Sequence, residues 1–322
     1  MYDNNTFLSV RNIYVEYTQN KQVIHAVNGV SFELEKGKTL GLVGETGAGK
    51  TTVAKSILRI LPDNSARFVS GEVILGGDNI TALEDANMLK IRGRRISMIF
   101  QDPMTALNPL MSVGEQIMEV FTLHRTELSR ADCDEEAARM LELVGIPRQR
   151  RFEYPHQFSG GMKQRVVIAM ALACDPELLL ADEPTTALDV TIQAQVLELI
   201  KDLQLKLNTS MILITHDLGV VAETCDSVAV MYAGKVVEYG DKWPIFQNPA
   251  HPYTIGLFGS LPSMNEEQKR LTPIRGLPPD PSRLPDGCSF AKRCPKASNN
   301  CKKNEVPLAE VSSDHFCRCL NV

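Results

Sequence analysis

Residues 44–51, with the sequence GETGAGKT, combine residue types that bind a phosphate chain. Glycines let backbone N–H groups converge on phosphate oxygens without clashes from Cβ atoms. In this pattern Lys50 reaches the β- and γ-phosphates of a nucleotide, and the hydroxyl of Thr51 is a ligand of Mg²⁺. A strand-like run precedes the segment and a helix-like run follows it, so a glycine-rich turn with an incidental lysine is the weaker reading. The segment therefore predicts a nucleoside triphosphate site.

Two adjacent carboxylates, Asp182 and Glu183, end the apolar run 177–183. Ligands bind at the carboxyl ends of strands in open α/β sheets, so an apolar strand delivers both groups to such an edge. Asp182 would hold Mg²⁺, directly or through water, and Glu183 would orient and deprotonate the attacking water. Alone, such a pair is more often a solvated turn. Beside a phosphate loop it indicates nucleotide hydrolysis.

A second anion-binding segment lies at 158–165, FSGGMKQR, ahead of a helical pattern at 161–174. Ser159 can cap that helix, and Gly160 and Gly161 leave its first amides open to an anion. A chain with one phosphate loop does not need a second anion site for the same nucleotide. The segment is therefore predicted to complete the site of another subunit, and a helix cap with no other role is the alternative.

These groups require an α/β domain to position them. The runs 97–100, 178–181 and 211–214 lack a polar face, which is typical of buried parallel strands. Helical patterns at 132–144, 161–174 and 190–206 alternate with them. The first 35 residues are β-rich, residues 109–158 are mostly helical, and prolines recur after 241, so the tail is expected to be rich in loops.

Composition excludes several classes of protein. The chain has 322 residues and is 43% hydrophobic, enough for one large domain or two ordinary ones. With 34 basic and 39 acidic side chains its net charge is -5, which argues against a general nucleic-acid binder. No apolar run approaches about 18 residues, and the N-terminus has no secretory pattern, so we expect a cytoplasmic protein without a membrane span.

The motifs identify the chain as similar to ABC ATPases. Residues 158–162 resemble their signature, usually L-S-G-G-Q, with Phe158 and Met162 departing from it at the two ends. The resemblance covers roughly 6–240. It implies a P-loop ATPase fold with a parallel core sheet, an N-terminal antiparallel β subdomain and a helical subdomain at about 109–170. The remainder, 241–322, is a proline-rich C-terminal extension with a cysteine cluster at 288–319.

The resemblance also assigns residue roles. Tyr17 looks like the aromatic that stacks on adenine, Gln101 like the Q-loop glutamine, 187–189 like the D-loop and His216 like the switch histidine. The ATP-binding residues implied are Tyr17, Gly44, Glu45, Thr46, Gly47, Ala48, Gly49, Lys50, Thr51, Thr52, Gln101, Ser159, Gly160, Gly161, Asp182 and Asp189. The catalytic residues implied are Lys50, Gln101, Glu183 and His216. The Mg²⁺ ligands implied are Thr51, Gln101 and Asp182.

Three further stretches narrow the family. FQDPMTALNP at 100–109, NPAHPYT at 248–254 and PIRGLPP at 273–279 resemble the D-type ATP-binding subunits of dipeptide and oligopeptide importers. This implies a peripheral ATPase on the cytoplasmic face of the membrane. Its implied partners are a second, related ATPase, two transmembrane permeases and an extracytoplasmic peptide-binding protein. The same motor importing nickel or glutathione, a soluble ABC protein of translation or DNA repair, and a nucleotide-regulated iron–sulfur sensor are the alternatives.

Five of the eight cysteines lie in the last 35 residues, and in a reducing compartment such a cluster favours a metal site over disulfides. Cys288, Cys294 and Cys301 have the spacing C-x₅-C-x₆-C, and Cys317 or Cys319 would follow as the last ligand. Thiolates can hold Zn²⁺ or an iron–sulfur cluster, and reduced unligated thiols are the third possibility. The resemblance to peptide-importer ATPases implies a [4Fe–4S] cluster on Cys288, Cys294, Cys301 and Cys319, with Cys317 as the alternative fourth ligand.

Overall fold

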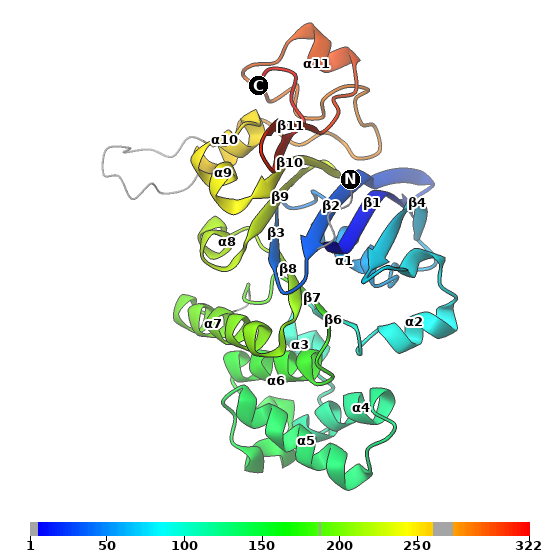
Figure 1. The fold of residues 1–322 in the computed structure, drawn as a ribbon, viewed down its shortest axis with the longest axis vertical. Coiled ribbons are helices and arrows are strands. Elements are labelled where there is room, and N and C mark those ends of the chain that lie inside the picture. Colours follow the sequence, from blue (N-terminus) through cyan, green and yellow to red (C-terminus); the bar gives the residue numbers. More distant parts are fainter. Residues whose placement is uncertain (1–5, 187, 260–272) are drawn as a thin grey trace. The chain divides into compact units, whose positions relative to one another are not determined.

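The computed structural model describes residues 6–186, 188–259 and 273–322 (Figure 1). The chain divides into two compact units. The first unit contains residues up to 34, 39–82 and 214–322. The second contains 35–38 and 83–213. In the described part of the chain, no helix is both long enough and apolar enough to cross a membrane.

An antiparallel sheet forms the N-terminal part of the first unit, with the strand order β2-β1-β4-β5. Its strands are β1 (Thr6–Gln19), β2 (Gln22–Glu35), β4 (Ala66–Leu75) and β5 (Asp78–Asn79). β1 and β4 pair from Leu8 opposite Leu75 to Tyr17 opposite Ala66. Residues 7–10 of β1 are all buried and alternation holds only at Ile13 and Val15, whereas β4 buries Val73 and Leu75 on alternate positions, so the alternation in the sequence is partial. The 3₁₀ turn η1 (Ile80–Ala82) follows this sheet.

The second sheet of the first unit has the order β11-β12-β10-β9-β3. Its strands are β3 (Thr39–Val43), β9 (Ser227–Tyr232), β10 (Lys235–Asp241), β11 (Ala309–Ser312) and β12 (His315–Cys317). The helices of this unit are α1 (Lys50–Ile57), α8 (Leu218–Thr224), α9 (Lys242–Gln247), α10 (Pro252–Gly259) and α11 (Asn299–Lys303). β3 and β9 are parallel, and every residue of β3 is buried, so this strand shows no polar face.

The second unit contains strands in the order β8-β7-β6 and most of the helices between 83 and 213. Its strands are β6 (Ile96–Ile99), β7 (Leu178–Asp182) and β8 (Ser210–Ile214). Its helices are α2 (Asp85–Ile91), α3 (Pro103–Ala106), α4 (Val113–His124), α5 (Arg130–Leu143), α6 (Gly160–Leu172) and α7 (Val190–Leu207), with 3₁₀ turns η2 (Arg148–Phe152) and η3 (Pro155–Gln157). The predicted strands and helices of this region are confirmed, and β6 and β7 are parallel.

Local side-chain bonds set where the helices begin. Ser112 and Glu115 form a capping box at the start of α4, and Ser129 and Asp132 form one at the start of α5. Each box satisfies backbone N–H groups that a helix leaves without partners at its first turn. The pattern S-x-x-[DE] therefore determines both helix starts.

A fully buried carboxylate, Glu238 on β10, connects the extension to the sheet of the first unit. Its two oxygens accept the backbone N–H groups of Ala250 and His251 at 2.7 and 2.9 Å. The ring Nε2 of His315 on β12 lies 2.7 Å from Oε1 of the same carboxylate. One side chain thus binds the start of the segment 250–254 and the hairpin of β11 and β12. These contacts are favourable because a buried carboxylate needs several hydrogen-bond donors.

His251 itself makes stability depend on pH. Its side chain is buried, and burial together with the charge of Arg318 lowers its pKa from 6.5 to about 4. Below pH 6.5 the unfolded chain binds a proton that the folded chain does not, so stability falls as the pH falls toward about 4. From pH 7.5 to pH 5 we expect this group to lower the free energy of unfolding by about 2 kcal/mol.

Urea titrations at pH 7.5 and pH 5 measure the difference in the free energy of unfolding. In His251→Gln this difference should be smaller by the contribution of His251. Exposed His156 is the matched control, because His156→Gln should leave the wild-type difference between the two pH values in place. Equal pH dependence in wild type and His251→Gln would contradict the assignment.

Candidate functional site

The phosphate loop connects β3 to α1, and its first and last glycines have backbone angles that only glycine adopts readily. Gly44 has φ 149° and Gly49 has φ 99°. A Cβ atom would lie 2.2 Å from the carbonyl oxygen of Met231 at Gly44 and 2.4 Å from that of Ala26 at Gly49. Both glycines are therefore required by the close approach of neighbouring backbone as well as by the turn.

Lys50, the first residue of α1, curls back over the phosphate loop. Its ammonium group donates to the carbonyl oxygens of Gly44 at 2.7 Å and Glu45 at 3.1 Å, and only 7% of the residue is exposed. The positive charge and the N-terminus of an eight-residue helix thus face the same loop. Thr51 and Thr52 follow in the first turn of α1 and are half-buried. This arrangement can bind a phosphate chain.

The carboxylates that follow β7 lie in the second unit. Asp182, the last residue of β7, is 3% exposed. Glu183 has φ 46°, a left-handed conformation that is uncommon outside glycine and clusters at functional sites. Its Oε2 accepts from the side-chain amide of Gln101 at 2.8 Å and from the hydroxyl of Thr186 at 2.9 Å. The structure therefore brings together Gln101 and Glu183, which are 82 positions apart in the sequence.

The loop that follows Gln101 is held by a buried glutamine. The side chain of Gln116, 3% exposed, accepts the Asn108 N–H at 2.8 Å and donates to the carbonyl oxygens of Asn108 and Met111 at 3.0 and 3.1 Å. Asp102 caps α3 by accepting the Met104 N–H at 2.8 Å. These bonds give the distinctive stretch 100–109 a defined conformation.

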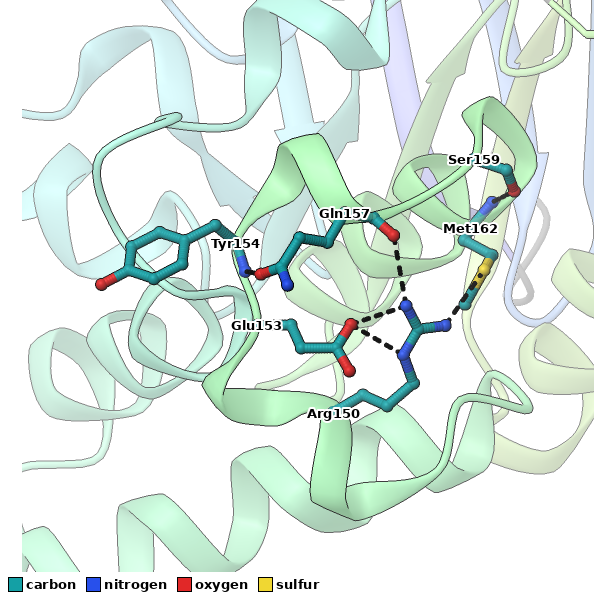
Figure 2. Close-up of polar contacts among 6 residues, drawn as sticks. All are labelled: Arg150, Glu153, Tyr154, Gln157, Ser159 and Met162. Carbon is teal, nitrogen blue, oxygen red and sulfur yellow. Dashed lines mark hydrogen bonds and ion pairs between the residues drawn. The ribbon is translucent and has the colours of Figure 1, made fainter.

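The signature segment is supported by a residue that the sequence did not indicate, Arg150 of η2 (Figure 2). The guanidinium donates to the carbonyl oxygen of Gln157 at 3.2 Å and to the sulfur of Met162 at 3.4 Å. It also lies 4.3 Å from the ring centre of Phe158, which is 5% exposed. Arg150 therefore contacts both residues at which this signature departs from the usual form, and in the sequence only its place in the basic run 148–151 marks it.

Arg150 is itself fixed by an ion pair with Glu153, at 2.9 Å from Nε and 2.6 Å from Nη2 (Figure 2). The hydrogen bonds with Glu153 raise the pKa of Arg150 and lower that of Glu153, so both groups stay charged. Ser159 then caps α6 by accepting the Met162 N–H at 3.4 Å. Ser159 and Gly160 are exposed and Gly161 is half-exposed, which leaves the start of α6 accessible to an anion.

The remaining predicted residues are distributed over both units. Tyr17 is half-buried on β1, and His216 is exposed two residues after β8. Asp189 is exposed at the N-cap position of α7, and Ala187 of the predicted D-loop lies outside the described residues. The phosphate loop, Tyr17 and His216 belong to the first unit, whereas Gln101, Asp182, Glu183, Ser159 and Asp189 belong to the second.

Four cysteines of the extension line one cavity. They are Cys288, Cys294, Cys301 and Cys319, together with apolar side chains that include Phe290, Val306 and Leu320. Asn321 donates from its backbone to the Cys319 sulfur at 3.4 Å and from its side chain to the Cys301 sulfur at 3.6 Å. All eight cysteines of the chain are free thiols.

Cys317 does not line this cavity, and burial raises the pKa of its thiol. Hydrogen bonding with Ser298 lowers the pKa of Cys301, whereas burial raises that of Cys288. Within residues 6–186, 188–259 and 273–322, no three His, Cys, Asp or Glu side chains gather as closely as a metal ion requires. The four thiols thus share a cavity in the structure without forming a closed ligand set.

Comparisons with known proteins identify the family of the chain. The ABC transporter family model matches residues 27–186, and the model for the C-terminal region of oligopeptide and dipeptide transporters matches 237–301. The dipeptide transport ATP-binding protein DppD of Bacillus subtilis is 51% identical over 97% of this chain and 93% of its own length. The oligopeptide transport ATP-binding protein OppD of Escherichia coli is 47% identical over 97% of this chain and 92% of its own length.

Solved structures show the same fold. A dimeric bacterial ABC transporter cassette matches with a TM-score of 0.65 and 27% identity, over 73% of this chain and 98% of that one. A dimer of an ATP-binding cassette in a post-hydrolysis state, bound to ADP and phosphate, matches with a TM-score of 0.65. The predicted ABC ATPase fold, the ATPase activity and the family resemblance are confirmed. The chain therefore belongs to the ATP-binding subunits of the dipeptide and oligopeptide ABC transporters.

Proposed function

We propose that this chain hydrolyses ATP to power the import of dipeptides or oligopeptides across the cytoplasmic membrane. The observation that carries the proposal is the carboxylate of Glu183, held 2.8 Å from the amide of Gln101 and directly after buried Asp182. A carboxylate held in this way, beside a second acidic group, is suited to orient and deprotonate water. The near full-length similarity to peptide-transport ATPases supports the cargo class.

Nucleotide binding is assigned to the phosphate loop and its neighbours. Backbone amides of 44–51 and the ammonium of Lys50 bind the phosphates, and Tyr17 stacks on the adenine. Thr51, Asp182 and Gln101 would hold Mg²⁺, since hard cations prefer carboxylate, hydroxyl and amide oxygens. When bound, Mg²⁺ would neutralise charge on the phosphates. His216 contacts the γ-phosphate from the end of β8.

The signature segment acts on the nucleotide of a second subunit. The exposed start of α6 offers amides to an anion, and the chain's own phosphate loop already provides such a site. ATP would then close a pair of ATPase subunits, with Asp189 crossing to the partner, and hydrolysis would open the pair. A related ATPase as the partner, two permeases and an extracytoplasmic peptide-binding protein complete the proposed transporter, with this chain at the cytoplasmic face of the membrane.

The cysteine cavity is proposed to hold a [4Fe–4S] cluster on Cys288, Cys294, Cys301 and Cys319. The proposal rests on the chemistry of the donors and not on a closed ligand set, because thiolates are the usual ligands of such clusters and Asn321 supplies N–H groups to two of the sulfurs. When bound, the cluster would supply a cross-link between parts of a loop-rich segment. These four cysteines share the cavity, whereas Cys317 lies outside it, which supports Cys319 as the fourth ligand.

Replacing Glu183 tests the catalytic assignment. Glu183→Gln keeps the size of the side chain but removes the base, so we expect ATP turnover to fall about 100-fold or more while ATP still binds. Turnover is measured in the assembled transporter and binding by equilibrium titration. Glu177→Gln is the matched control, because Glu177 forms only a partly exposed ion pair with Arg95 before the same strand. Normal turnover in Glu183→Gln would remove the residue from this role.

Replacing Arg150 tests whether the signature segment serves hydrolysis. Arg150→Gln removes the support of Phe158 and Met162, and we expect turnover in the assembled transporter to fall about tenfold through misplacement of α6. ATP binding by the chain alone should stay unchanged, since the segment acts on the partner's nucleotide. Arg148→Gln is the control, because Arg148 pairs with Glu135 at the surface. A similar loss in both variants would show that Arg150 has no special role.

Cluster content tests the cysteine assignment. Protein purified without oxygen should show broad visible absorption and contain iron and sulfide. Cys319→Ser should lose both, whereas Cys317→Ser should retain them. Stoichiometric zinc without sulfide, or retention of the cluster in Cys319→Ser alone, would overturn the assignment.

A further inference from the structure

Glu45, the second residue of the phosphate loop, is held by two residues of the C-terminal extension. The hydroxyl of Tyr253 accepts the backbone N–H of Glu45 at 2.9 Å. The guanidinium of Arg293 donates to the Glu45 carboxylate at 2.9 Å, across 248 positions of sequence. Both the backbone and the side chain of one loop residue are therefore bound by a segment that lies outside the ATPase family match at 27–186.

Arg293 is largely buried and makes several hydrogen bonds. Its side chain is 6% exposed. Besides Glu45 it donates to the hydroxyl of Tyr232 at 3.2 Å and to the carbonyl oxygens of Arg275 and Ile274 at 3.1 and 3.4 Å. These contacts hold the stretch 273–279 as well as the phosphate loop. A buried, multiply bonded guanidinium loses little entropy in making its ion pair, so this contact is stronger than an exposed one.

Tyr253 is also enclosed by its neighbours. It is fully buried, with its ring 4.7 Å from that of Tyr232 and 5.5 Å from that of Phe290. Burial raises the pKa of its hydroxyl, so the group stays protonated and neutral. Its oxygen therefore accepts the Glu45 N–H from a fixed position, and this fixes the backbone at the start of the loop.

The ion pair with Arg293 neutralises the negative charge that Glu45 brings to the phosphate loop. A carboxylate in a loop that binds a polyanion repels the ligand, and the repulsion is large where water is partly excluded. Glu45 is 27% exposed at its side chain, so solvent screens its charge only in part. Arg293 supplies the opposite charge 2.9 Å away. The loop can therefore carry an acidic residue and still favour phosphate.

We propose that Arg293 and Tyr253 are positioning residues through which the C-terminal extension sets the affinity of the phosphate loop for nucleotide. Arg293 neutralises Glu45, and Tyr253 holds its backbone. The proposal rests on the assignment of residues 44–51 as the nucleotide site. It makes the extension part of the nucleotide-binding machinery and not only an appendage of the ATPase.

The test is a fluorescence titration of the full chain with mant-ATP and Mg²⁺. Binding by the wild type establishes the nucleotide site itself, so failure there is separate from failure of the proposal. Arg293→Gln leaves Glu45 unpaired, and we expect its Kd to rise about tenfold or more. Lys292→Gln removes one positive charge from the exposed neighbouring residue, and we expect it to change the Kd by less than about twofold.

A second substitution distinguishes electrostatics from loss of structure. Adding Glu45→Gln to Arg293→Gln removes the unpaired charge, so the Kd should return to within about threefold of the Glu45→Gln value. A locally disordered variant would not recover in this way. An unchanged Kd in Arg293→Gln, or no recovery in the double variant, overturns the role of Arg293.

Tyr253→Phe tests the other contact and keeps the proposal open to test if Arg293→Gln does not fold. The substitution removes one hydroxyl and keeps the buried ring, so we expect the Kd to rise about three- to fivefold with the melting temperature little changed. A Kd equal to that of the wild type overturns the role of Tyr253.

Discussion

In the first unit, the hydrogen bonds of the buried Glu238 carboxylate hold the C-terminal extension on the sheet. It binds the backbone of Ala250 and His251 and the ring of His315, so one acidic group on a core strand organises two distant parts of the extension. Removing water from a carboxylate is costly unless several donors replace it, and here the extension provides them. Tyr253 lies two residues beyond His251, so the segment that reaches the phosphate loop starts from this anchor.

The ATPase motifs gain their chemistry from neighbours that hold them and not from their own residues alone. Glu183 is bound by Gln101 and Thr186, the loop after Gln101 by Gln116, and the signature by Arg150. Each supporting group is a side-chain amide, hydroxyl or guanidinium that makes hydrogen bonds to the motif or to the loop beside it. The family motifs can be recognised in the sequence, whereas the polar contacts that support them appear only in the structure.

Much of this fold could be predicted because buried parallel strands and glycine-rich loops leave unbroken local patterns. The strands at 178–181 and 211–214 and the helix at 190–206 are such cases, and their boundaries differ from β7, β8 and α7 by no more than one residue. Arg150 and Arg293 could not be predicted, because an arginine has no local pattern that reveals its partner. The partner of Arg293 is 248 positions away, and only the tertiary structure brings the two together.

Lys50 is bound by the same loop that it follows in the chain. Its ammonium donates to the carbonyl oxygens of Gly44 and Glu45, so these two oxygens compete with any bound anion for the ammonium. An incoming anion exchanges one set of acceptors for another, and the free energy gained is only the difference between them. A charged phosphate oxygen is a stronger acceptor for an ammonium than a neutral carbonyl oxygen, so a lysine held in this way favours anions over neutral ligands.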